Sequence, residues 1–356
     1  MPCTGEVLVS PESITPSLPG WNVLGVFNPA AARLPSKKIM LLARVAEQPR
    51  PGRGGIVRCP AISGKGVLIS EKIPAEKVAS LSRTTVCLKD RTCRLTSISH
   101  FRKIALSSDG SAVESISQKP FFTGTGNEGQ FGVEDPRITK LPGKYAMTYV
   151  AVSLHEGVST SLALSKNLRD WKRQGIIFRG ENKDVVIFPE KIGGKYVALH
   201  RPSGFFAFTR PSLWISYSKD LVYWGRERAI VHPRPNSWDS FKIGAGPPPI
   251  KTSEGWLEIY HGIEWQGGKN KYSAGAMLLD LKSPERVIAR SPKSKPLFSP
   301  VKRFEKKGFV NRVVFPTAAL PSLDGKSLLI YYGAADTSIG FRKIPIRDVL
   351  NSMLPE

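Results

Sequence analysis

Five segments of the sequence repeat one pattern, and a repeat of this kind limits the possible folds more than any other feature. Each segment has a short turn with Lys or Gly, then a run of aliphatic and aromatic residues that ends in polar groups. The five segments are Lys37–Arg44, Gly143–Tyr149, Gly194–Arg201, Gly255–Gly262 and Gly325–Gly333. A strand between turns fits each of them, so we expect five equivalent units of β-structure.

A proline-bearing element precedes each segment by four to nine residues. Because proline has no N–H to donate, it favours the start or the edge of a strand, and an edge beside a central channel suits it. The five elements are Asn28–Ala30, Asp135–Arg137, Phe188–Glu190, Pro247–Pro249 and Phe315–Thr317.

A second repeat supports the first. Ser165–Trp171 recurs as Ser218–Trp224, 53 residues later, and a four-stranded propeller blade takes about 40–50 residues. We therefore predict an all-β chain that folds as a five-bladed β-propeller, with the active site at the central channel. A β-sandwich with chance Gly-Lys turns is the alternative, and it does not explain five paired elements in constant order.

The predicted propeller is a single domain over residues 1–356. It has an irregular segment at about 1–20 and a short helix at about 345–353. Residues 49–119 fit the repeat least well. They are expected to complete the first blade and to form an elaborated approach to the second.

Side chains at the starts and ends of innermost strands converge on the channel of a propeller. Carboxylates accept hydrogen bonds from sugar hydroxyls, and Arg binds phosphate oxygens in pairs. The expected mixture suits a polyhydroxylated substrate together with an anionic co-substrate. The residues expected to converge are Asn28, Arg44, Glu134, Asp135, Arg137, Glu190, His200, Arg201, Tyr260, His261 and Asp336.

The chain is strongly basic, with 52 Lys and Arg against 29 Asp and Glu and a formal charge of +23. Three interpretations compete: a basic surface that serves solubility, a site for anionic ligands, and nucleic-acid binding. No zinc-finger spacing or RNP-like aromatic motif accompanies the basic residues, so nucleic acid is the least favoured partner.

The four cysteines form no Cys-x-x-Cys pair, which indicates neither a disulfide scaffold nor a zinc site. The first residues show no basic segment followed by an apolar run, and no apolar stretch approaches the roughly 18 residues that span a bilayer. We expect a cytoplasmic protein without a membrane partner.

An ordered set of short motifs between Asn22 and Arg342 resembles family 130 of the glycoside hydrolases. Each motif is weak by itself, and the specificity comes from their order. The motifs are Phe27–Ala30, Gly132–Thr139, Asn182–Asp184, Phe188–Lys191, Leu199–Pro202, Lys242–Gly244, Ile259–Gly262 and Tyr331–Asp336.

The resemblance implies a five-bladed propeller and, for most of that family, reversible phosphorolysis of β-mannosides. It implies that Asp135 is the general acid, which relays a proton through the 3-hydroxyl of the sugar. Phosphate attacks the anomeric carbon from the opposite face and inverts it, releasing α-mannose 1-phosphate. The expected partners are a β-1,2- or β-1,4-linked manno-oligosaccharide and inorganic phosphate, with no cofactor and no metal.

By the same resemblance, one group of residues binds phosphate and another holds the sugar. The residues expected to bind phosphate are Arg201, Lys242, His261 and Tyr272. The resemblance assigns the mannosyl unit to Asn28, Arg44 and Asp336, and the further candidates for contact with the substrate are Glu134, Arg137, Lys183 and Glu190. All four phosphate-binding positions carry residues that can donate to phosphate, which favours phosphorolysis over hydrolysis. An inverting hydrolase would instead need a second carboxylate to activate water.

Structural alternatives stand beside these roles. Asp135 could cap a turn, Glu134 could only orient Arg137, and His200 is expected to be a structural hydrogen-bonding residue.

The sequence departs from the family pattern at two places. Leu42-Ala43-Arg44 lacks the aromatic residue that the family usually has before the arginine, and Asn311-Arg312 replaces a proline-asparagine pair. These departures leave the linkage specificity open.

The other functions that remain open are an inverting β-mannosidase, a β-1,2-mannosyltransferase with a sugar-nucleotide donor, and a non-catalytic glycan-binding propeller. A homo-oligomer is also possible.

Overall fold

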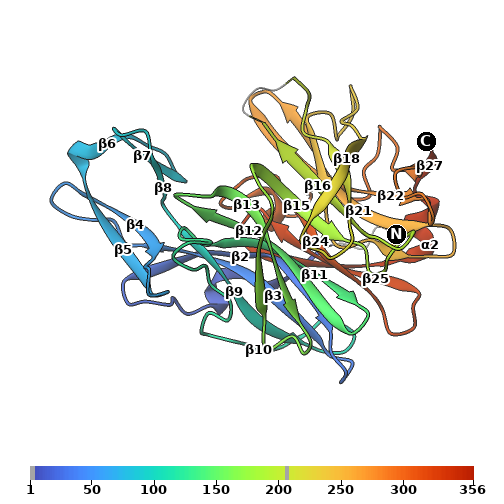
Figure 1. Cartoon of the computed structure of the whole chain (residues 1–356), viewed down its shortest axis with the longest axis horizontal. Helices are drawn as coiled ribbons and strands as arrows, with labels where there is room; N and C mark the ends of the chain where they lie inside the picture. Colours follow the sequence, from blue (N-terminus) through green and yellow to red (C-terminus); the bar gives the residue numbers. More distant parts are fainter. Residues whose placement is uncertain (1–4, 205–207) are drawn as a thin grey trace.

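The chain folds into small antiparallel sheets, which confirms the predicted all-β class (Figure 1). The computed structural model describes residues 5–204 and 208–356. Within them, helical structure is limited to four short elements, and no helix is long and apolar enough to cross a bilayer. The four are η1 (Pro11–Ser13), η2 (Ala75–Lys77), α1 (Arg303–Lys306) and α2 (Ile346–Asn351).

Five larger sheets follow one another along the described chain, and each is numbered here in that order. The first contains β2 (Trp21–Arg33), β3 (Ile39–Pro49), β9 (Ile98–Leu106) and β10 (Val113–Ile116). The second contains β11 (Val133–Leu141), β12 (Lys144–Ser153), β13 (Gly157–Ser165) and β14 (Lys172–Phe178). The third contains β15 (Glu181–Ile187), β16 (Tyr196–Ser203), β17 (Leu213–Ser218) and β18 (Trp224–Val231).

The last two sheets include both ends of the described chain. The fourth contains β19 (Lys242–Ala245), β20 (Ile250–Lys251), β21 (Trp256–Gln266), β22 (Lys269–Leu279), β23 (Val287–Arg290) and β27 (Leu354–Pro355). The fifth contains β24 (Val314–Pro321), β25 (Ser327–Ala334), β26 (Ser338–Pro345) and β1 (Glu6–Val9).

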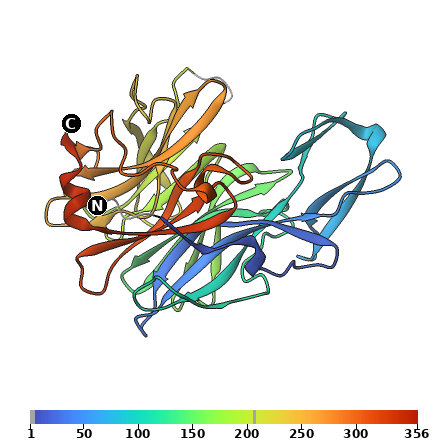
Figure 2. The same cartoon turned by 180° about the vertical axis from the view of Figure 1, so that it is seen from behind.

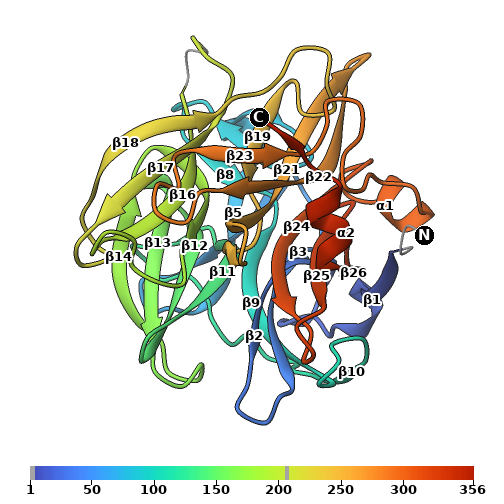
Figure 3. The same cartoon turned by 90° about the vertical axis from the view of Figure 1, so that its right-hand side faces the viewer.

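Strand β1 corrects the prediction of an irregular segment over residues 1–20. Glu6–Val9 pairs with the outer edge of β26, as Figure 3 shows, and η1 follows. The pairing satisfies edge N–H and C=O groups of β26 and buries Val9. Residues 1–4 lie outside the described residues. The helix α2 lies inside the predicted range 345–353.

The repeated segments of the sequence are the second strands of the five sheets: β3, β12, β16, β21 and β25. These strands are buried on both faces, because each sheet packs between two neighbours. Their apolar runs are therefore continuous, not alternating; Leu328 to Ala334 in β25, for example, are all buried.

The sheets pack in a closed cyclic order. Among the described residues, five large apolar clusters each join two neighbouring sheets: first to second, second to third, and so on to fifth and first. Val26 and Leu41 of the first sheet, for example, share a cluster with Leu329 of the fifth. Each such buried aliphatic side chain stabilises the fold by about 1.5–3 kcal/mol.

The segment 49–119 divides into two parts. β9 and β10 complete the first sheet, as predicted for the remainder of the first unit. The rest forms two small sheets, one of β4 (Ile56–Ile62) and β5 (Leu68–Pro74) and one of β6 (Val78–Leu81), β7 (Thr85–Leu88) and β8 (Cys93–Leu95). We call β4 to β8 the arm, since it extends from one end of the molecule (Figures 1 and 2).

The second repeat is the same turn in consecutive sheets. The hydroxyl of Ser165 accepts a hydrogen bond from the N–H of Leu168 (2.9 Å), and Ser218 and Leu221 make the same contact (2.9 Å). Cys59, Cys87 and Cys93 are free thiols, and Cys3 lies outside the described residues.

Candidate active site

A cavity of about 250 Å³ lies where the first strands of the sheets meet. Neighbouring first strands contact one another there: β2 with β11 and β24, and β15 with β11 and β19. Polar and charged side chains from all five sheets line the cavity. They are Asn28, Arg44, Glu134, Asp135, Lys183, Asp184, Arg201, Lys242, His261, Tyr272 and Asp336.

Irregularities in the first strands aim three of these side chains. The pairing register shifts after Phe27 in β2, after Glu134 in β11 and after Lys183 in β15. The residues that follow, Asn28, Asp135 and Asp184, have φ angles of 45°, 50° and 56°. Asn and Asp tolerate this left-handed region better than other non-glycine residues, which explains their recurrence at equivalent places.

Arg44 on β3 holds two acidic residues of β11. Its Nη1 donates to Oδ1 of Asp135 and its Nη2 to Oε1 of Glu134, both at 2.8 Å. Its Nε donates to the hydroxyl of Ser99 (2.9 Å). All three donor directions of the guanidinium are thus used, which fixes the position of Asp135.

The carboxyl group of Asp135 is ionised. Burial favours its neutral form, but the guanidinium groups of Arg44 and Arg137 and a hydrogen bond from Asn28 Nδ2 (2.9 Å) outweigh burial and lower its pKa. The Asn28 carboxamide and Arg44 converge on the same oxygen, Oδ1. These two hydrogen bonds leave the other carboxylate oxygen, Oδ2, unused.

Arg137 lies beneath the cavity and does not line it. The side chain is 1% exposed, its Nε donates to the carbonyl of Gly246 (2.6 Å), and its Nη1 donates to the carbonyl of Asp135 (2.9 Å). This arginine braces the backbone of the acidic tetrapeptide from below. It does not pair with Glu134, whose partner is Arg44.

Three positively charged side chains and one imidazole come from the third and fourth sheets. Lys183 on β15, Arg201 on β16, Lys242 on β19 and His261 on β21 line one side of the cavity. Burial and the neighbouring Arg201 lower the pKa of Lys242. Burial also lowers the pKa of His261 to about 3, so this imidazole is neutral at pH 7.

Tyr272 lies with its ring against the imidazole of His261. The ring centroids are 6.4 Å apart with an interplanar angle of 26°. Burial and the carboxylate of Asp336 raise the pKa of Tyr272 to about 12, so the phenol keeps its proton and can donate. The four residues expected to bind phosphate therefore lie together on one wall.

Asp184 is a cavity residue that the sequence reasoning did not select. Its Oδ2 accepts a hydrogen bond from Arg201 Nε (2.7 Å) and lies 3.6 Å from His261 Nε2. Burial opposes ionisation, but the guanidinium groups of Arg201 and Arg137 more than compensate and lower the pKa of Asp184. Asp184 in β15 and Asp135 in β11 hold equivalent places, since each directly follows the residue after which the pairing register shifts.

Asp336 faces the cavity from the turn after β25, with a φ of 48°. Burial, together with the carboxylates of Asp135 and Glu134, raises its pKa to about 7, against the opposing effect of Arg44. Asp135 and Asp336 are thus neighbouring carboxyl groups with pKa values moved in opposite directions.

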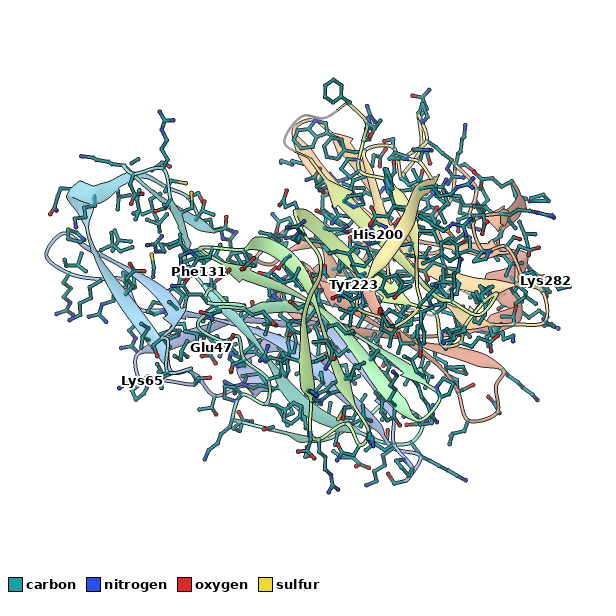
Figure 4. The ribbon with its side chains drawn as sticks, in the orientation of Figure 1. Glu47, Lys65, Phe131, His200, Tyr223 and Lys282 are labelled. Atoms are coloured by element: carbon teal, nitrogen blue, oxygen red, sulfur yellow. The ribbon has the colours of Figure 1, made fainter. Side chains whose placement is uncertain are left out.

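Besides Arg137, three further residues that were expected to converge on the site lie elsewhere. Glu190 forms an ion pair with Lys251 (2.5 Å) outside the cavity, because β15 ends three residues earlier. His200 is fully buried and bonds with Asn182 and Ser216, in agreement with a structural role (Figure 4). The hydroxyl of Tyr260 donates to Asp239 (2.9 Å). His200 and Tyr260 alternate with residues that face the cavity, and so they point away from it.

Within the described parts of the chain, no group of three or more His, Cys, Asp or Glu side chains is arranged to hold a metal ion.

Comparison with known proteins identifies the family of this chain. Residues 91–354 match the sequence model of the glycoside hydrolase 130 family, described as beta-1,4-mannooligosaccharide phosphorylase. The chain belongs to this family. The family 130 chain is 38% identical over 352 residues to beta-1,2-mannobiose phosphorylase of Listeria innocua, covering 97% of this chain and 96% of the relative.

One further relative and one solved structure also resemble this chain. The 1,2-beta-oligomannan phosphorylase of a Thermoanaerobacter species is 40% identical over 233 residues, which is 65% of this chain and 74% of the relative. A solved structure of the Listeria innocua enzyme in complex with beta-1,2-mannobiose has a TM-score of 0.86 and 37% identity. It covers 97% of this chain and 96% of that one.

Proposed function

We propose that this family 130 chain catalyses reversible, inverting phosphorolysis of β-1,2-linked mannosides to α-mannose 1-phosphate. The observation that carries the proposal is the division of one cavity into two walls. Asp135, Glu134, Arg44 and Asp336 occupy the wall of the first, second and fifth sheets, and the cations occupy the wall of the third and fourth. We choose the β-1,2 linkage because two relatives that align with this chain over most of their own length have this linkage in their names.

We also infer that the five sheets are the blades of a five-bladed propeller and that the cavity is one mouth of its central channel. The cyclic order of the apolar clusters supports this, as does the contact of β24 with both β21 and β2.

Phosphate takes the cationic wall in the proposed complex. Arg201 presents a rigid fork that matches phosphate oxygens, while Lys242 and Lys183 contribute positive charge. Tyr272 donates its hydroxyl, and neutral His261 donates from one ring nitrogen. Phosphate is itself a nucleophile, so this wall needs no general base and the reaction needs no cofactor.

The mannosyl unit takes the space between the walls. Asn28, Arg44 and Asp336 offer donors and acceptors to its hydroxyls. Glu134 keeps Arg44 oriented, and Arg137 braces the backbone. Asp135 relays a proton through the 3-hydroxyl to the departing glycosidic oxygen, so its carboxyl group does not have to touch that oxygen. Phosphate attacks from the opposite face, which inverts the anomeric carbon.

Hydrolysis would need a general base that activates water. An inverting hydrolase places a general base across the sugar from its acid, with roughly 6.5–9.5 Å between the two carboxyl groups. The carboxylate that the third and fourth sheets contribute to the cavity is Asp184, and the guanidinium groups of Arg201 and Arg137 hold its pKa low. A carboxylate with a lowered pKa is a weak base, which favours phosphate over water.

The test is to incubate the enzyme with β-1,2-mannobiose, with and without inorganic phosphate, and to follow α-mannose 1-phosphate by phosphorus NMR. We expect the sugar phosphate and one equivalent of mannose with phosphate, and neither product without it. β-1,4-mannobiose serves as the linkage control and should react more slowly. Release of mannose at the same rate with and without phosphate would show that the enzyme is a hydrolase.

A further inference from the structure

The arm carries a disproportionate share of the positive charge of the chain. Residues 49–96, which include β4 to β8, contain ten Lys and Arg and three Asp and Glu, a net charge of +7. The proposed reaction uses none of these residues, because none of them lines the catalytic cavity. The arm charge therefore calls for a separate explanation.

Four of the ten basic residues gather around one hollow at the start of the arm. The hollow measures about 560 Å³ and is formed by the loop before β4 and by the hairpin of β4 and β5. Its lining consists of Arg50, Pro51, Arg53, Ile56, Arg58 and Lys72. All four cationic side chains are exposed to solvent and belong to described residues.

Arg58 and Lys72 are direct cross-strand partners in the β4–β5 ladder. Directly opposite side chains of an antiparallel pair project from the same face, and like charges there repel each other. A neutral or acidic residue at either position would relieve the repulsion. The pair is unfavourable for folding unless an anion lies between the two side chains.

No acidic side chain of the described residues lies within 4.0 Å of the four cations. Glu71 is next to Lys72 in sequence, but alternation along β5 sends it to the other face, where it pairs with Arg94 (3.0 Å). The hairpin thus compensates its charge on one face and leaves it uncompensated on the face with the hollow.

We propose that this hollow on the arm binds an oxyanion group of an anionic glycan, such as a phosphate or a uronate carboxylate. Three of the four cations are arginines, whose guanidinium forks fit phosphate and carboxylate oxygens in pairs. The hollow contains no aromatic ring on which the bases of a single-stranded nucleic acid could stack, and the substrate proposed above for this chain is itself a carbohydrate. A carbohydrate is therefore the favoured carrier of the anion.

The site is separate from catalysis, so its test is a binding measurement and does not depend on turnover. The probes are a phosphorylated mannan, polygalacturonate, a neutral mannan and a DNA duplex, each at 50 and 200 mM salt. The variant is Arg58→Gln/Lys72→Gln. The matched control, Lys65→Gln/Lys282→Gln, removes two charges from exposed lysines outside the hollow, one on the arm and one at the far edge of the molecule (Figure 4).

We expect salt-sensitive binding of one or both anionic glycans, at least about tenfold tighter than neutral mannan. Arg58→Gln/Lys72→Gln should weaken this binding about tenfold or more, because charge-assisted hydrogen bonds are lost, whereas the control pair should change it less than about threefold. Comparison of the two anionic glycans identifies phosphate or carboxylate as the preferred group. Thermal unfolding should show that Arg58→Gln/Lys72→Gln is at least as stable as wild type, since it removes a repulsion.

Three results would overturn the proposal. Equal weakening by both double variants would mean a diffuse charge effect. Binding of neutral mannan as tight as that of both anionic glycans would exclude recognition of an anion. Tighter binding of the duplex, lost in Arg58→Gln/Lys72→Gln, would assign the hollow to nucleic acid.

Discussion

Arg44 Nη1 donates to Asp135 Oδ1 across 2.8 Å, joining residues that lie 91 positions apart in the chain. The contact links the second strand of the first sheet to the first strand of the second sheet. The cationic partners, Arg44 first, outweigh the effect of burial and lower the pKa of Asp135, so this carboxyl group is an anion before substrate enters. A proton must therefore reach this carboxylate before it can serve as an acid.

Asp135→Asn should lower kcat for phosphorolysis of β-1,2-mannobiose by at least about 100-fold, because the amide cannot supply the proton. Binding of the disaccharide, measured by calorimetry, should change little, since the amide oxygen still accepts from Asn28 and Arg44. A variant that keeps more than a tenth of wild-type kcat would remove Asp135 from the role of acid.

Lys242→Ala should raise KM for phosphate by roughly 10–100-fold, the effect of losing one charge-assisted hydrogen bond. KM for the mannoside should change less than threefold, about 0.6 kcal/mol. Lys242 is a cleaner probe than Arg201, whose removal would also leave Asp184 buried without its partner. Lys251→Ala, in the same sheet but paired with Glu190, is the control and should leave both constants unchanged.

Asp336→Asn should stabilise the protein above pH 7 relative to wild type. The pKa of Asp336 rises from its ordinary 3.8 to about 7 on folding. Between these values the folded state binds the extra proton, so this group makes the protein less stable as pH rises from 4 to 7. The difference in unfolding temperature between variant and wild type should widen from pH 5 to pH 8.5. The exposed Glu76→Gln serves as control, and a constant difference across this range would contradict the assignment.

Glu47→Ala should cost about 3–5 kcal/mol of unfolding free energy in urea, since it leaves the buried guanidinium of Arg102 without its anion. Arg102 Nη2 donates to Glu47 Oε1 at 2.6 Å, and both side chains are 0% exposed. Glu47→Leu/Arg102→Met, which removes both charges, should cost less than the single change. If the double change costs more, packing and not the unpaired charge explains the loss.

Glu190→Gln should leave kcat/KM for both substrates within about twofold of wild type. Glu190 pairs with Lys251 away from the cavity, and an exposed ion pair contributes at most about 1 kcal/mol to stability. Steady-state kinetics test this directly. A loss of activity greater than about twofold would contradict the placement of Glu190 outside the site.

Much of the fold was readable in the sequence because the repeat is local. A turn residue followed by an apolar run predicts a strand whatever lies around it, and all five such runs became second strands. The position of Glu6–Val9 was not readable. Four residues with little pattern become a strand only because the edge of β26, more than 300 residues later, needs a partner.

The candidate site shows the same division. The repeat selected Asp135, Arg44, Arg201 and His261, since each occupies a definite place in it, and the family resemblance added Lys183, Lys242 and Tyr272. Strand alternation then decided which neighbours face the cavity: His261 does, whereas Tyr260 and His200 point into the sheets. Asp184 was overlooked because the repeat equates it with Asp135 only when the two strand irregularities are seen together.

The sequence by itself determined the repeat, the strand class and the kinds of chemistry that the chain can bring together. The tertiary structure alone decided which charges neutralise one another. Arg44 holds Asp135 as an anion, Arg201 holds Asp184, and Asp336 keeps its proton near neutral pH. The reason is that electrostatic interaction depends on distance and burial, which the packing of distant strands sets and which the order of residues does not contain.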